Sequence, residues 1–412
     1  MRSPWRGILR SLSNPNYRIW AAGSLISNIG TWMQRTAQDW LVLTVLTHNN
    51  ATAVGIVTGL QFAPQILLLP FTGSAADRFD RRKLMFFTQG ALGLLALGLG
   101  LLTVTGLVQL WQVYVFALLL GCATAFDIPA RQSFVTELVS DAYLSNAVAL
   151  NSTSFNLGRM LGPAIAGVLI TAIGTGWVFL LNAASYVAVL GALAALRVAL
   201  LHRDGLRRRG KGGFTEGLRY VRGRPDLIVV LMMLALIGTF GVHFPVFIST
   251  MTVSVFHAGA GEYGALASMM ALGSVTGALL AARREAPTPG LLIGAAGAFG
   301  IGLGLAAMMP SYTLFSLVLI FIGLCSQTFT TSANSAIQLW SEASLRGRMM
   351  ALMMAVALGG APLGAPTIGW VADTFGPRWG LAVGATSGLL SALTGLAGFA
   401  WWRRRAASVA AR

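Results

Sequence analysis

Twelve long apolar runs separated by short polar stretches determine what this sequence can fold into. A helix needs about 20 mainly apolar residues to cross the hydrocarbon core of a bilayer, and each run reaches roughly that length. Charged residues make up only 10% of the 412 residues, whereas soluble domains contain about 25%. The sequence therefore predicts an all-α membrane protein and excludes a water-soluble fold. The runs lie near residues 17–46, 53–76, 84–107, 111–134, 145–173, 176–197, 227–256, 262–282, 289–309, 312–338, 345–372 and 379–402.

The basic residues predict how the chain is oriented. Its net charge is +16, which in a soluble chain would suggest a nucleic-acid partner, but here the bases gather in alternate connections. Positive residues stay on the cytoplasmic side during membrane insertion. We therefore expect a multi-pass protein of the cell membrane with both termini cytoplasmic and no nucleic-acid partner. The cytoplasmic connections and tails contain Arg78, Arg81, Arg82, Lys83, Arg131, Arg197–Arg224, Arg283, Arg284, Arg346, Arg348 and Arg403–Arg405, and the opposite connections contain only Arg378.

A polar connection in the middle of the chain divides the apolar runs into two sets of six. Glycines repeat between the sets with an offset of 202 residues, and such repeats are typical of transporters that bind substrate between two related halves. The matching glycines are Gly121 with Gly323, Gly158 with Gly360, Gly162 with Gly364 and Gly167 with Gly369. We predict a cytoplasmic tail at 1–16, six-helix bundles at 17–197 and 227–402, a cytoplasmic linker at 198–226 and a basic cytoplasmic tail at 403–412.

The connection after the second run contains a recognisable motif. A glycine, three residues, an acid and clustered bases stand between Gly73 and Lys83, which resembles the cytoplasmic signature loop of the major facilitator superfamily. The chain has Asp80 where that family usually has glycine. The resemblance implies a cytoplasmic gate in which an acid pairs with a base or a helix N-terminus; an ordinary positive-inside loop is the alternative. We assign to the gate Gly73, Asp77, Arg78, Arg81 and Arg82, with Asp127 and Arg131 as a gate pair or helix-end cap.

The fifth run reads G-R-M-L-G-P-A-I-A-G and resembles the antiporter motif of drug exporters in the same superfamily, with Ala166 replacing one glycine. Small residues allow helices to pack closely, and a proline frees a carbonyl and bends the span; packing alone is the alternative explanation. Within the superfamily this motif accompanies export, so the resemblance implies an exporter. The residues that match the motif are Gly158, Gly162, Pro163 and Gly167.

Three further segments narrow the resemblance to one branch of the superfamily. NIGTWMQRTAQDWLVL, FDIPARQSFVTELV and FTEGLRYVRGRP resemble the bacterial exporters that include the enterobactin exporter and macrolide efflux proteins. Drug/proton antiporters typically have an arginine in the fourth span, whereas this chain has Ala117 there, ahead of Gly121. Proton coupling would therefore have to use another residue.

Polar residues inside the apolar runs are the candidates for a transport pathway, because ionisable groups at membrane depth cost roughly 2.5 kcal/mol or more and mark functional sites. They are Asn28, Trp32, Arg35 and Asp39 in the first run and Asn156 and Arg159 in the fifth, each set on one helical face. A structural Arg35–Asp39 ion pair is the alternative for the first run. His243 is a candidate proton carrier because its reference pKa is near 6.5; a histidine hydrogen-bonded to a neighbour is the alternative.

Several kinds of chemistry are not expected. The sequence has no G-x-x-x-x-G-K-[ST] phosphate loop, and its four histidines are scattered, so we predict no ATPase, no enzyme, no cofactor and no metal site. We expect a secondary active exporter of a small organic molecule (a drug, siderophore or secreted metabolite) that works by alternating access. The resemblance implies proton antiport and a monomer. A nutrient importer on the same fold is the main alternative, and a membrane enzyme or receptor is the other.

Overall fold

The computed structural model describes residues 9–69, 71–72, 75, 79–202, 214–282 and 286–410, and the regular structure in these residues is helical. Three predicted gate residues, Gly73, Asp77 and Arg78, lie outside the described residues. The elements in chain order are η1 (Arg10–Ser13), α2 (Pro15–Trp40), η2 (Leu41–Leu46), α3 (Ala51–Leu67), α5 (Arg81–Val104), α6 (Leu110–Leu138), α7 (Asp141–Ile173), α8 (Thr175–Ala195), η3 (Val198–Leu200), α9 (Phe214–Arg222), α10 (Pro225–Phe240), α11 (Phe244–Thr250), η4 (Met251–Val255), α12 (Ala260–Ala282), α13 (Pro289–Met308), α14 (Tyr312–Trp340), α15 (Arg346–Gly359), α16 (Ala361–Phe375) and α17 (Pro377–Ala410).

Local sequence signals set several helix ends. The side chain of Asn14 accepts hydrogen bonds from the first turn of α2, which has proline at its first position, and both features favour a helix start. The Asp80 carboxylate accepts from the backbone N–H of Lys83 at 3.0 Å and so caps α5. Gly174 and Gly376 follow α7 and α16 with φ of +85° and +102°, a region that glycine enters without steric cost. These two glycines are also 202 residues apart.

Ten helical segments of the described chain are long and apolar enough to cross a membrane. They correspond to the third to twelfth apolar runs of the sequence. The first run forms α2 and the π-helical η2, and it is not among the ten because α2 contains many polar residues. The second run forms α3, whose described part, at 17 residues, is slightly shorter than the ten segments. Many large apolar side chains of the ten segments are exposed, as expected for helices that face lipid. The fold is that of an all-α, multi-pass membrane protein.

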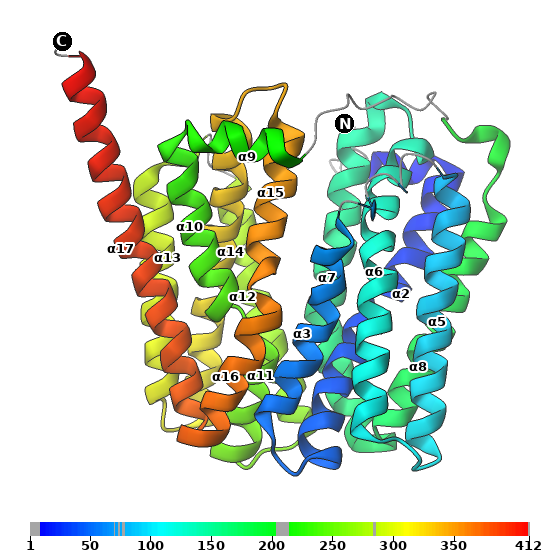
Figure 1. Ribbon diagram of the computed structural model, residues 1–412. Helices are drawn as coiled ribbons and strands as arrows, with labels where there is room; N and C mark the ends of the chain where they lie inside the picture. The colour runs from blue at the N-terminus through cyan, green and yellow to red at the C-terminus, as the bar shows by residue number, and fades with distance from the viewer. Residues whose placement is uncertain are drawn as a thin grey trace, which may run out of the picture. The chain divides into compact units, whose positions relative to one another are not determined.

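The first of two compact units consists of residues 1–48, 63–209 and 259–268. Within it α2 packs against α7 and α8, and α5 packs against α6 and α8 (Figure 1). A buried apolar cluster in this unit contains Tyr17, Trp20 and Phe134, with the Trp20 and Phe134 rings edge to face at 5.5 Å. This packing fixes α2, which has most of the polar residues singled out from the sequence, against α7.

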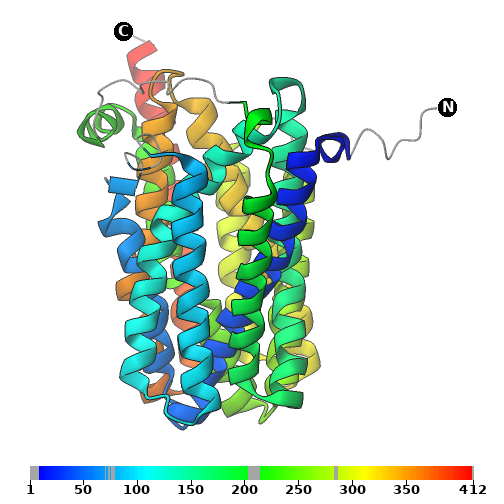
Figure 2. The ribbon, with the colours of Figure 1, turned by 90° about the vertical axis from the view of Figure 1, so that its right-hand side faces the viewer.

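The second unit consists of residues 49–62, 210–258 and 269–412. Here α10 packs against α15 and α17, and α13 packs against α14 and α17. The last helix, α17, extends beyond its neighbours in this unit (Figures 1 and 2). The pairing in the second unit repeats that of the first, with α10, α13, α14, α15 and α17 in the places of α2, α5, α6, α7 and α8.

The repeated glycines make the same contacts in each unit. A Cβ added to Gly158 would lie 2.8 Å from the backbone carbon of Asn28 in α2, and its repeat partner Gly360 meets Thr239 of α10. Gly162 meets the next turn of α2 at Trp32, and Gly364 meets the Thr239 backbone again and His243, which follows the end of α10. Because these helices touch through backbone atoms, only glycine fits at the contacts. The repeat is therefore a packing repeat.

We expect Gly158→Leu to destabilise the protein, because overpacking a helix contact costs about 1–3 kcal/mol. Gly191→Leu is the matched control: Gly191 lies inside α8, is exposed, and has nothing within 4 Å of an added Cβ. Thermal unfolding in detergent should show a lower midpoint for Gly158→Leu and an unchanged or higher one for Gly191→Leu. Equal midpoints for the two variants would contradict the close α2–α7 contact.

Candidate functional site: a charged aromatic face on α2 and α7

A pair of arginines flanks one tryptophan in the first unit. The Arg35 guanidinium carbon lies 5.0 Å from the centre of the Trp32 ring, and that of Arg159 lies 5.9 Å from the same centre. Phe155 of α7 meets Trp32 edge to face, with ring centres 5.8 Å apart. Trp32, Arg35, Phe155 and Arg159 are all partly exposed within the structure. We call these four residues the α2–α7 face.

The glycines of the antiporter-like motif place Arg159 on this face. A Cβ on Gly162 would lie 2.5 Å from the Cβ of Trp32, so any larger residue would move α7 away from α2. Arg159 follows Gly158, whose own close contact with Asn28 is one turn earlier. Pro163 lies inside α7, which continues without a break from Asp141 to Ile173. The sequence thus identified Trp32, Arg35 and Arg159, which the structure brings together, but it did not identify Phe155.

Asp39 is buried, with 7% of its surface exposed, and it has a partner that the sequence did not reveal. Its carboxylate accepts a hydrogen bond from the Tyr263 hydroxyl at 3.2 Å, and the Tyr263 ring stacks on Trp40 at 5.9 Å. The direct Arg35–Asp39 ion pair that the spacing allows is not among the ion pairs of the described residues. Tyr263, near the start of α12, provides the hydrogen bond, and Arg35 interacts with the Asp39 carboxylate through charge alone.

Neither arginine of the α2–α7 face has a direct anionic partner among the described residues, although the Asp39 carboxylate interacts electrostatically with Arg35. Within the described ranges, neither guanidinium forms an ion pair or donates a hydrogen bond to protein. The Nε atom of Arg35 is buried without a hydrogen-bond partner. Buried donors are normally satisfied, and an exception calls for an explanation. Guanidinium groups in this state have the hydrogen-bond donors that pair with an oxyanion.

Asn28 belongs to a neighbouring polar network instead. Its side-chain oxygen accepts from Arg131 at 3.3 Å, and its amide donates to the Ser154 hydroxyl of α7 at 3.0 Å. Arg131 also forms an ion pair with Asp127 at 3.3 Å. Two residues of α5 complete the network, because the Thr88 hydroxyl and the Gln89 amide donate to Asp127 at 2.8 and 2.6 Å. This network ties α2, α5, α6 and α7 together.

The other predicted residues are placed elsewhere. Asn156 donates to the Ser152 carbonyl of its own helix at 2.8 Å. Arg81 forms an ion pair with Glu137 at 2.8 Å, a partner missed from the sequence. Arg82 donates to the carbonyls of Leu193 and Ala194 at the end of α8, where a cation complements the helix dipole. The Arg81 and Arg82 contacts fasten helix ends, the Asn156 contact lies inside α7, and none of them involves a residue of the α2–α7 face.

His243 lies in the second unit, between α10 and α11. Its Nε2 atom lies 2.6 Å from the Thr239 carbonyl oxygen, and the residue is almost fully buried. This is the hydrogen bond to a neighbour that the sequence left as the alternative. The nearby Gly364 leaves space for the imidazole, because an added Cβ would lie 2.8 Å from Nε2.

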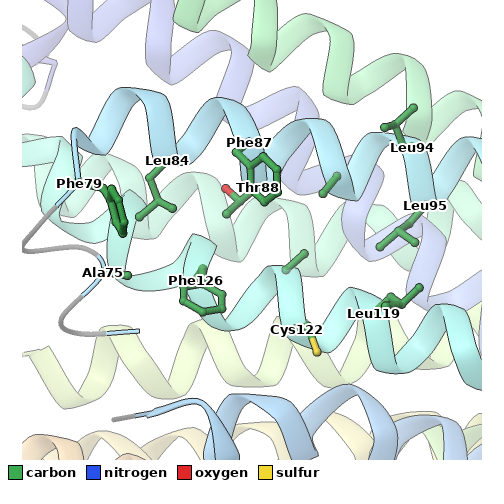
Figure 3. A pocket seen from close by; sticks show the side chains of 12 residues that line it. Ala75, Phe79, Leu84, Phe87, Thr88, Leu94, Leu95, Leu119, Cys122 and Phe126 are labelled. Atoms are coloured by element: carbon green, nitrogen blue, oxygen red, sulfur yellow. The ribbon is translucent and has the colours of Figure 1, made fainter. Parts of the chain in front are cut away.

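An apolar groove of about 580 Å³ runs between α5 and α6 (Figure 3). Its lining is hydrocarbon apart from the Thr88 hydroxyl and the Cys122 thiol, and several side chains such as Phe87 and Leu94 are strongly exposed. No residue of the α2–α7 face lines it. Apart from these two groups, the lining offers nothing with which to recognise a polar ligand.

Comparison with known proteins places the chain in a family. A family model described as "Transmembrane secretion effector" matches residues 7–403. The chain belongs to this family of major facilitator transporters. The resemblance seen in the sequence is thereby confirmed, and so is the expectation that the chain is a transporter and not an enzyme.

Relatives of known function share about a quarter of this transporter's residues. The staphyloferrin A transporter of Staphylococcus aureus is 26% identical over 86% of this chain and 89% of its own length. The multidrug efflux pump Tap of Mycolicibacterium fortuitum is 26% identical over 86% and 88%. The enterobactin exporter EntS of Shigella boydii serotype 4 is 26% identical over 81% and 77%.

Solved structures share the fold. A D-xylose–proton symporter superposes with a TM-score of 0.73 at 13% identity, covering 92% of this chain and 96% of its own. A bacterial homologue of the human lysosomal transporter Spinster, in an inward-facing and unoccupied conformation, gives 0.72 at 16% identity, covering 98% and 97%. The chain therefore has the major facilitator fold.

Proposed function

We propose that this transporter is a secondary active exporter of a small organic molecule, with the α2–α7 face as part of its substrate pathway. The observation that carries the proposal is the pair of arginines beside Trp32 on two apolar helices, neither of which forms an ion pair or a hydrogen bond with the described residues. Charged groups at membrane depth are costly and rare unless they serve transport. The relatives named as exporters or efflux pumps support outward transport.

The proposed architecture has twelve spans in two six-helix bundles at 17–197 and 227–402, joined by the cytoplasmic linker. The repeated glycine contacts and the repeated helix pairing support it. Alternating access in such folds is a rocking of one half against the other around the bound substrate. We further propose a monomer in the cell membrane that exchanges substrate for protons. Asp39 is the proposed proton carrier, because it is a buried carboxylate whose charge changes on protonation.

The direction of transport is tested in cells that lack their main efflux pumps. Expression of the chain should raise the inhibitory concentration of at least one compound in a panel of antibiotics and siderophore-like chelators. Inside-out vesicles with an acidic interior should then accumulate that compound. Accumulation only in vesicles of the opposite orientation would identify an importer and contradict the proposal.

The proposed threading predicts that residue 211 and the carboxyl end lie on the same, cytoplasmic side, because the bases of both segments resist translocation. Single cysteines introduced at these two positions into a cysteine-free variant should both be protected from a membrane-impermeant maleimide in intact cells. Opening the cells should expose both. Labelling of one position alone in intact cells would contradict the twelve-span topology.

A further inference from the structure

The two units repeat the helix contacts of the α2–α7 face but not its charges. The residues 202 positions after Phe155 and Arg159 are Ala357 and Ala361. For α2 and α10 the offset can be set in two ways. The prolines that start these helices are 210 residues apart, and Asn28 and Thr239, which meet the equivalent glycines Gly158 and Gly360, are 211 residues apart. At either offset the counterparts of Arg35 and Asp39 are uncharged: Pro245 or Val246, and Ser249 or Thr250.

This difference between the two units shows whether the charged residues are needed for helix packing. The second unit makes the same glycine-mediated contact between α10 and α15–α16 with uncharged residues at all of these positions. The contact therefore does not require an arginine or a carboxylate. A residue that is expensive at membrane depth and unnecessary for packing is explained by a ligand.

The sign of the charge identifies the ligand class. The α2–α7 face has two guanidinium groups, and the single carboxylate that interacts with them among the described residues, Asp39, also accepts a hydrogen bond from Tyr263. Guanidinium is the side chain best suited to bind carboxylate, sulfonate or phosphate oxygens through paired hydrogen bonds. Trp32 and Phe155 add an aromatic surface beside it, which favours an apolar or aromatic body next to the charged group.

We propose that the α2–α7 face binds an organic anion, with Arg35 and Arg159 on its oxyanion and Trp32 and Phe155 against its apolar part. This inference rests on the proposed function and deepens it by naming the substrate class.

The test measures binding and does not depend on transport. Purified protein in detergent is heated with 10 mM of 1-naphthoate, 1-naphthalenesulfonate, the neutral 1-naphthamide or the cationic 1-naphthylmethylammonium. The parent should be stabilised by the two anions and not by the amide or the cation. Equilibrium dialysis with radiolabelled naphthoate should show affinity reduced by about tenfold or more in the double variant Arg35→Val/Arg159→Ala, because a hydrogen-bonded charge contributes that much.

The variants are chosen so that folding does not confuse the result. Val and Ala are residues that the second unit has at the corresponding positions, so the double variant should fold. Arg346→Ala is the matched control, since Arg346 is an exposed arginine at the start of α15, in the second unit, and is not one of the residues of the α2–α7 face. It should bind naphthoate like the parent.

Each outcome decides the matter. Equal stabilisation by naphthoate and naphthamide, no stabilisation by either anion, or unchanged affinity in the folded double variant would overturn the anion site while leaving export intact. If the anions bind as expected but no compound leaves cells or enters inside-out vesicles, export fails and the binding site stands.

Discussion

Replacing Asp39 by Asn is expected to stop uphill export while leaving downhill exchange of substrate in place. In the parent, the Tyr263 hydroxyl donates a hydrogen bond of 3.2 Å to the Asp39 carboxylate. Asparagine keeps an oxygen that can accept this hydrogen bond, but it cannot take up or release a proton. If Asp39 carries the coupled proton, an imposed proton gradient loses its effect on transport. We expect gradient-driven accumulation to fall by about tenfold or more, a barrier change of at least about 1.4 kcal/mol.

The measurement compares two modes in the same vesicles. Accumulation under an acid-inside gradient reports coupled transport, and counterflow from preloaded substrate without a gradient reports substrate movement alone. Asp141→Asn is the matched control, because it makes the same change at an exposed position in the first turn of α7. Gradient-driven accumulation that survives in Asp39→Asn would assign proton coupling to another group. Loss of both modes would make Asp39 a binding or structural residue.

The helices could be predicted from the sequence because their signals are local. Ten apolar runs became membrane-length helices, and punctuation such as Asp80 before α5 or Gly174 after α7 set their ends. The offset of 202 residues between glycines also had a structural cause, since Gly158 and Gly360 make equivalent helix contacts. Each of these features depends on local composition, on periodicity, or on a glycine at a position where a larger residue would not fit.

The partners in the site could not be predicted, because they lie far apart in the sequence. Helical spacing made Arg35 the natural partner of Asp39, but Tyr263, 224 residues away, provides its hydrogen bond. Phe155 likewise is one apolar residue among many in the sequence, and only the packing of α7 against α2 shows its contact with Trp32. Spacing along one helix names the residues on a face, but the neighbouring helices decide which of them pair.

Replacing Arg159 by Ala is expected to reduce export by about tenfold or more without destabilising the protein. The guanidinium carbons of Arg35 and Arg159 lie 5.0 and 5.9 Å from the same ring centre, so they are at most about 11 Å apart. At an effective dielectric constant near 20, two like charges at that distance repel by about 1.5 kcal/mol. Losing the contact with Trp32 costs about 0.5–1 kcal/mol. The repulsion that is relieved exceeds the contact energy that is lost, so the variant should be at least as stable as the parent. This is expected where a residue serves function and lowers stability.

Thermal unfolding and export are measured on the same preparations of Arg159→Ala. We expect a midpoint at or slightly above that of the parent and export reduced by about tenfold or more, as for the loss of one hydrogen-bonded charge to the substrate. Arg224→Ala is the opposing control: Arg224 holds Asp226 with hydrogen bonds of 3.0 and 2.7 Å, and its removal leaves a buried carboxylate unpaired, which is destabilising. A clear fall in the midpoint of Arg159→Ala, matching that of Arg224→Ala, would mean that Arg159 is needed for the fold. Unchanged export with an unchanged midpoint would remove Arg159 from the substrate pathway.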